Sequence, residues 1–144
     1  MFPVFPFAHI VTAVLLLIVG FLFHWIGQLI SVINWALATR LGLQEKDMPQ
    51  AYRVYEHAIA VADVAVGWTY GLTAVGLLLR APWGFRLACV PGAVLIYHAV
   101  SAWVWEGNRR KAGAGMWSNA MRVGWCTANL VTGCLALLCA WAGG

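Results

Sequence analysis

Charged residues are scarce in this chain. Only 10% of its 144 residues are Asp, Glu, Lys or Arg, and 62% are hydrophobic, whereas soluble domains carry about 25% charged residues. This composition excludes an ordinary soluble domain. A bilayer crossing takes about 20 apolar helical residues, and the chain contains four apolar stretches of at least that length. We therefore predict an all-α integral membrane four-helix bundle.

Common metal and phosphate motifs are also missing. The sequence has no Cys-x-x-Cys, Glu-x-x-His or His-Glu-x-x-His spacing and no glycine-rich phosphate loop. Its four cysteines are therefore expected to be buried free thiols. Haem bound by His24 and His98 would need both histidines at one depth, and residue counting places His24 higher. We accordingly predict no metal site, and the sequence leaves the cofactor unknown.

The apolar stretches predict helices over residues 7–38, 52–79, 85–106 and 117–141. Together they fill a single transmembrane domain, residues 1–144, and the short connections favour up-down-up-down packing. The first residues lack the basic segment of a cleavable signal peptide, so we expect the first helix to be retained.

Basic residues gather in two of the three connections. The second connection carries only Arg80 and Arg86, whereas the first and third carry Arg40, Lys46, Arg53, Arg109, Arg110 and Lys111. The positive-inside rule then places the first and third connections in the cytoplasm and both termini on the non-cytoplasmic side, in a bacterial inner membrane. The net charge of +4 thus reports topology, and we expect no nucleic-acid partner.

Polar residues inside the second and third stretches carry the strongest functional signal. Glu56, Asp63 and Tyr70 recur every seven residues and so share one helix face. An ionisable group in lipid costs roughly 2.5–3.5 kcal/mol on insertion scales, so Asp63 should face the protein interior. His98 lies at a matching depth and is predicted to face Asp63, above a second layer of Glu56 and Glu106. These acid and imidazole groups are the predicted catalytic residues.

Polar stripes on all four predicted helices add candidate ligand contacts. His24 and Gln28 lie one turn apart on the first helix, and Arg122 and Asn129 share a face of the fourth. Arg122 should neutralise Glu56 or Glu106. If the stripes converge they form a pocket opening inward, and its predicted substrate-binding residues are His24, Gln28, Tyr70, Ser101, Trp105, Arg122 and Asn129.

An Asp beside a His in a low-dielectric interior is an acid-base element that can titrate near neutrality. It predicts a small membrane protein that binds or protonates a hydrophobic small molecule or quinone. Two alternatives stay open: a non-catalytic accessory subunit, whose polar residues only fix helix packing, and a small transporter or proton path. Catalysis itself is left undecided. The expected partners are membrane lipid and either a second copy or a larger membrane complex.

Three segments, Gly76-Leu-Leu-Leu79, Pro82-Trp-Gly84 and Gly92-Ala-Val-Leu-Ile-Tyr97, resemble the middle of small bacterial four-helix membrane proteins of the DoxX-like type. The resemblance implies a four-helix fold. It also implies a link to quinone or redox enzymes, because the DoxX type includes a subunit of a thiosulfate:quinone oxidoreductase. It assigns no catalytic residue to this chain.

Overall fold

The computed structural model describes residues 6–113, 115 and 117–143, and within these residues it contains helices and connections but no strand. The predicted all-α class is confirmed. Four helical stretches of the described chain are long and apolar enough to cross a membrane, namely Ala8–Ile33, Gln50–Leu78, Pro82–Lys111 and Asn119–Gly143.

The first stretch is not one continuous α-helix. It comprises α1 (Ala8–Leu15), the π-helix η1 (Leu16–Trp25) and α2 (Ile26–Ile33). The chain then breaks at Asn34 and continues as α3 (Trp35–Arg40). Asn34 has non-helical backbone angles, and its Oδ1 accepts a hydrogen bond of 3.0 Å from the Leu37 N–H. Asparagine is a preferred N-cap, so this local bond ends the helix that the apolar pattern carried on to residue 38.

The later helices also depart from their expected bounds. After α4 (Gln50–Leu78), the third stretch divides into α5 (Pro82–Leu87) and α6 (Cys89–Lys111). Pro91 causes this division, because it has no N–H for the Leu87 carbonyl four residues earlier. The third stretch continues to Lys111, beyond the expected end at residue 106, and α7 spans Asn119–Gly143.

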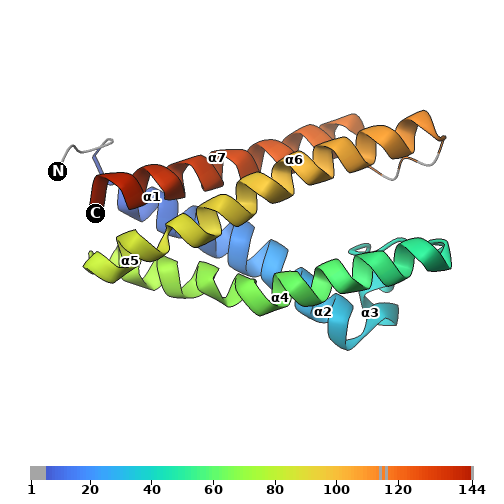
Figure 1. Ribbon diagram of the computed structural model, residues 1–144, viewed down its shortest axis with the longest axis horizontal. Helices are drawn as coiled ribbons and strands as arrows, with labels where there is room; N and C mark the ends of the chain where they lie inside the picture. Colours follow the sequence, from blue (N-terminus) through green and yellow to red (C-terminus); the bar gives the residue numbers. More distant parts are fainter. Residues whose placement is uncertain (1–5, 114, 116, 144) are drawn as a thin grey trace.

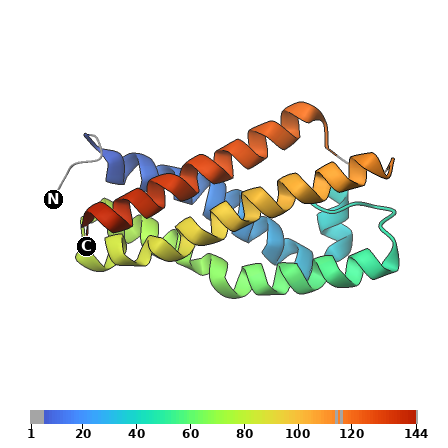
Figure 2. The same cartoon turned by 45° about the horizontal axis from the view of Figure 1, so that its top comes forward.

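The helices form two closely packed groups. Helices α6 and α7 lie side by side along their length, while α4 packs against α1, η1 and α2 (Figures 1 and 2). The start of α1 and the end of α7 lie at one end of the molecule, with α5 (Figure 1). At the other end, the rings of Tyr52 and Tyr55 on α4 meet Trp105 on α6, with ring centres 5.5 and 6.3 Å apart.

Glycines allow the close approach of α4 to the first stretch. A Cβ at Gly67 would collide with Trp25 Cδ1, and a Cβ at Gly71 would lie 3.0 Å from the Phe21 ring. The Trp25 indole N–H also donates a 3.0 Å hydrogen bond to the Val64 carbonyl. The two glycines therefore leave room on α4 for aromatic rings, as small residues do between membrane helices.

The outer surface is strongly apolar. Only 33% of the most apolar window of each long helical stretch is buried inside the protein. Large apolar side chains point outward along these stretches, among them Leu22, Phe23, Trp68, Tyr97, Val100 and Leu138. The four cysteines are free, but Cys89 and Cys134 are exposed, which corrects the expectation that all four are buried.

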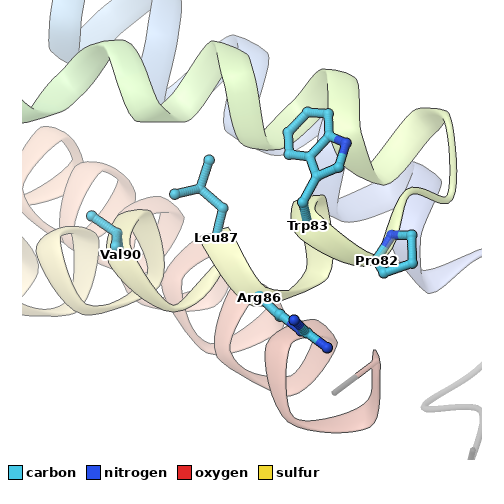
Figure 3. Close-up of a pocket in the computed structure, with 5 residues that line it drawn as sticks. All are labelled: Pro82, Trp83, Arg86, Leu87 and Val90. Atoms are coloured by element: carbon cyan, nitrogen blue, oxygen red, sulfur yellow. The ribbon is translucent and has the colours of Figure 1, made fainter.

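A shallow depression of about 630 Å³ lies on α5 and the start of α6, lined by Pro82, Trp83, Arg86, Leu87 and Val90. Figure 3 shows Trp83 pointing toward α4 while Arg86 points away from it. A Cβ at Gly76 would lie 2.6 Å from the Trp83 ring, so this indole packs directly on the α4 backbone.

The substitution Gly67→Ala should destabilise the fold. Its methyl group would collide with the Trp25 ring, and moving that ring would break the bond to Val64. We expect a loss of about 1–3 kcal/mol, typical of overpacking, as a lower thermal midpoint in detergent. Gly124→Ala is the matched control because no heavy atom lies within 4 Å of its Cβ position. Equal midpoints for the two variants would contradict this packing.

Candidate functional site

His24 is the centre of the candidate site. It lies near the end of η1 and is only 3% exposed. Its Nδ1 forms a 2.8 Å hydrogen bond with the Tyr70 hydroxyl, and its Nε2 lies 3.5 Å from Asp63 Oδ2. Nε2 has no hydrogen-bond partner among the described residues. The imidazole is therefore held at one nitrogen and open, toward a carboxylate, at the other.

One helix supplies the side chains that face the two nitrogens of this imidazole. Asp63 and Tyr70 are seven residues apart on α4, which is about two turns, so they share a face and lie on opposite sides of the ring. Gly20 helps to bring the helices this close, because a Cβ there would lie 2.6 Å from the Tyr70 ring. The seven-residue spacing thus correctly predicted that Asp63 and Tyr70 share a helix face, whereas Glu56 lies outside the cluster.

Asp63 has a second contact with the first helical stretch. Its Oδ2 accepts a 3.1 Å hydrogen bond from Gln28 Nε2, and Gln28 lies one turn after His24. The side chain of Asp63 is 15% exposed, against 3% for His24. Asp63 is therefore the member of this pair that can be reached from outside the bundle.

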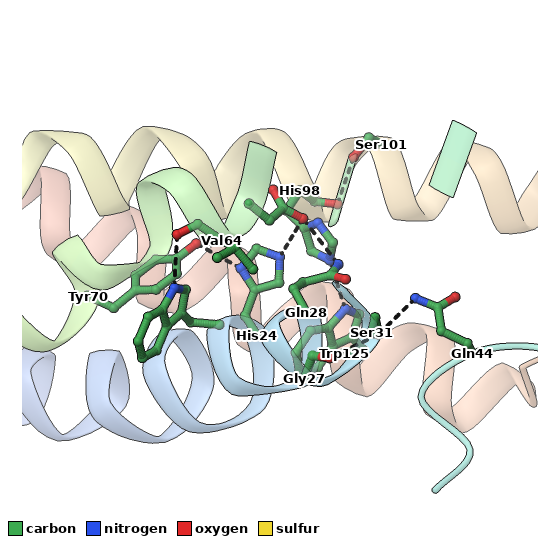
Figure 4. A network of polar contacts seen from close by, with 12 residues as sticks. His24, Gly27, Gln28, Ser31, Gln44, Val64, Tyr70, His98, Ser101 and Trp125 are labelled. Atoms are coloured by element: carbon green, nitrogen blue, oxygen red, sulfur yellow. Dashed lines mark hydrogen bonds and ion pairs between the residues drawn. The ribbon is translucent and has the colours of Figure 1, made fainter. Parts of the chain in front are cut away.

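His98 completes the cluster from α6. Its ring centre lies 4.2 Å from that of His24, and the two ring planes are tilted by 52°. The Trp125 indole N–H on α7 donates a 3.3 Å hydrogen bond to His98 Nε2, and the two rings meet edge to face. Figure 4 shows these residues converging from the two packed groups of helices. We call His24, Asp63 and His98 the His/Asp cluster.

The structure brings Asp63 and His98 into one cluster but gives them different hydrogen-bond partners. One ligand atom from each cluster residue lies within 4.8 Å of the others. Asp63 bonds Gln28 and His98 bonds Trp125, with His24 beside both. The expectation that His24 lies higher than His98 is wrong, because their rings are in contact distance.

The His/Asp cluster has the composition of a metal site. Two imidazoles and a carboxylate are ligands that first-row divalent metals accept. A tetrahedral ion with bonds of about 2.1 Å, however, requires ligand atoms about 3.4 Å apart. The lone pair of His98 Nε2 is already directed at the Trp125 N–H. A metal bound through His98 Nε2 would therefore displace this hydrogen bond.

Glu106 and Arg122 join α6 to α7 and to the segment between these helices, and they do not contact the cluster. Glu106 is 2% exposed, and its Oε1 accepts hydrogen bonds from the Trp117 N–H at 3.0 Å and Arg110 Nε at 3.3 Å. The Arg122 guanidinium lies 3.8 Å over the Trp103 ring and donates to its carbonyl at 2.7 Å. The expected neutralisation of Glu56 or Glu106 by Arg122 is therefore replaced by a cation–π contact.

The remaining predicted site residues are not members of the His/Asp cluster and have other contacts. Ser101 donates a 3.1 Å hydrogen bond to the His98 carbonyl of its own helix, and Trp105 packs with the two tyrosines of α4. Asn129 is fully buried and donates a 2.8 Å bond to the Trp125 carbonyl. Glu56 is half-buried on α4.

Trp125 is the neighbour of the His/Asp cluster that sequence reasoning missed. It lies one turn before Asn129, so it borders the polar stripe of α7, but aromatic residues in membrane helices are usually read as packing or interfacial anchors.

No family model matches this chain, and no curated protein and no solved structure matches it. Function is therefore inferred from the geometry of the His/Asp cluster.

Tyr70→Phe should destabilise the protein without changing its overall shape. Removing the hydroxyl leaves the buried Nδ1 of His24 without its partner, which costs about 1–3 kcal/mol. Chemical unfolding in detergent, followed by circular dichroism, measures the loss. Tyr97→Phe is the control, because Tyr97 is 72% exposed. A Tyr70→Phe variant as stable as the control would show that this hydroxyl does not hold His24.

Proposed function

We propose that this chain is an integral protein of a bacterial inner membrane, with four helices packed up-down-up-down and both termini on the non-cytoplasmic side. The apolar outer surface and the length of the four helical stretches support insertion. The basic first and third connections are joined by the 2.6 Å ion pair between Arg109 and Glu45. Their common end is the cytoplasmic one by the positive-inside rule.

Cysteine labelling tests this orientation. In a variant whose native cysteines are replaced by serine, Gln44→Cys should resist a membrane-impermeant maleimide added to intact cells. Arg86→Cys, in the α5 segment at the other end, should react. Labelling of Gln44→Cys from outside would reverse the orientation. Labelling of neither site in intact cells, with both labelled after lysis, would place both connections inside and contradict the four-crossing topology.

We also propose that the His/Asp cluster binds a hydrophobic small molecule and exchanges a proton with it. The observation that carries this proposal is the buried His24 imidazole, fixed by Tyr70 at Nδ1 and open toward Asp63 at Nε2. When Tyr70 donates its O–H to Nδ1, the neutral imidazole carries its own proton on Nε2. That N–H faces the Asp63 carboxyl group, which also accepts a hydrogen bond from the Gln28 amide.

Asp63 is the proton-exchanging group in this proposal, and His98 is a hydrogen-bond donor to the ligand. Asp63 is more exposed than His24, and His98 is also half-buried, so a ligand entering from the bilayer meets these two first. With Nε2 accepting from Trp125, a neutral His98 carries its proton on Nδ1, where the N–H can donate a hydrogen bond to the ligand. A quinone is the first ligand to test, because its carbonyl oxygens accept hydrogen bonds and because of the DoxX-like resemblance.

A non-catalytic accessory role is the second candidate. It is favoured by the Gln28–Asp63 and Trp125–His98 bonds, which join neighbouring helices and would stabilise packing without any chemistry. A small transporter or proton path would use the same titratable groups.

Two substitutions at Asp63 separate proton exchange from packing. In nanodiscs, decylubiquinone binding is followed by tryptophan quenching. A pH indicator in weak buffer follows the proton that the Asp63 carboxylate takes up from water in order to donate a hydrogen bond to the bound carbonyl oxygen. Asp63→Asn keeps the shape and the hydrogen-bonding capacity, so the fold should persist while proton exchange falls by at least about tenfold. Asp63→Leu removes the bonds as well. An accessory role predicts the reverse, with Asn behaving as wild type and Leu alone disrupting assembly.

A further inference from the structure

A groove of about 630 Å³ lies where α2, α3 and the start of α4 meet, at the end of the molecule opposite α5. Its lining combines apolar side chains, among them Val32, Ile33 and Val54, with polar ones, among them Arg53 and His57. A groove with this mixed lining suits a molecule that has a polar head and a hydrocarbon chain.

The polar part of the lining is basic and partly preorganised. The Arg53 guanidinium lies 5.2 Å from the centre of the Trp35 ring, and the Trp35 and His57 rings are 6.5 Å apart. Stacking on tryptophan restricts the guanidinium without neutralising it. In the described part of the chain no carboxylate lines the groove, and Arg53 is in no ion pair. An anion is therefore the complementary ligand.

The position of the groove identifies the source of that anion. The first candidate membrane span ends at Ile33 and the second begins at Gln50, so the groove lies at the level where the bilayer meets water. Ile33 and Val54 are 74% and 65% exposed, so apolar surface is available for an acyl chain beside the groove. Basic side chains at this level attract the anionic lipids of the cytoplasmic leaflet.

We propose that this groove binds one anionic phospholipid. Its phosphate lies against Arg53 and His57, and the start of an acyl chain lies along Ile33 and Val54. This inference rests on the membrane placement proposed above, but not on proton exchange at the His/Asp cluster.

Native mass spectrometry of the detergent-purified protein tests the proposal, with phosphatidylglycerol and phosphatidylcholine as probes. Wild-type protein should retain one phosphatidylglycerol more tightly than phosphatidylcholine. Arg53→Gln should lower this preference by about fivefold, the effect of one basic residue at a membrane surface. Arg86→Gln is the matched control, because Arg86 lines the depression at the opposite end. Trp35→Leu should weaken retention less than Arg53→Gln does.

Several results would overturn the proposal. These are equal retention of the two lipids, an Arg53→Gln variant that binds as the Arg86→Gln control does, and displacement of lipid by millimolar inorganic phosphate, which would make free phosphate the ligand. A dimer that Arg53→Gln dissociates would make a second copy the occupant. Circular dichroism confirms that each variant is folded.

The two proposals fail separately. Asp63→Asn should retain phosphatidylglycerol as wild type does, so loss of proton exchange alone leaves the lipid site intact. Release of the chain from cell membranes by alkaline carbonate would instead refute the membrane placement, whatever the lipid result.

Discussion

The cost of burying a histidine organises the interior of this protein. An imidazole with no partner in an apolar interior costs about 1–3 kcal/mol per unsatisfied group, comparable to the gain from packing a whole apolar side chain. Here α4 supplies Tyr70 and Asp63 on opposite sides of the His24 ring. The first helical stretch must therefore lie against α4 at one height and one rotation, which also fixes Gln28 beside Asp63.

Small residues allow this close placement without steric clashes. Gly20 and Gly67 leave room for the Tyr70 and Trp25 rings, so the helices are close enough for hydrogen bonds across the interface. In a membrane the bilayer offers little hydrophobic drive for helices to associate. Close contacts and a few polar bonds must supply the specificity, and this chain concentrates both around the His/Asp cluster.

Composition and periodicity predicted the helical class and the polar faces, because each depends on residue type and spacing alone. They missed the helix ends, which depend on single local bonds. Asn34 ends α2 five residues before the expected bound, and α6 continues five residues beyond residue 106. Counting from the wrong ends moved His24 and His98 apart, although their rings are neighbours. The rotamers of Arg122 and Trp125 were equally out of reach, since each is decided by a partner on another helix.

The winding of η1 gives the His/Asp cluster an unusual sensitivity to sequence length. A π-helix fits more residues into each turn than an α-helix, and the ten residues of η1 end just after His24. Rewinding by one residue to α geometry would rotate the imidazole by about 100° about the helix axis. Both of its contacts with α4 would be lost in one step. A single-residue insertion or deletion within Leu16–Trp25 therefore alters the contacts at the centre of the molecule, whereas the same edit in the connection after Arg40 leaves the rotation of His24 unchanged.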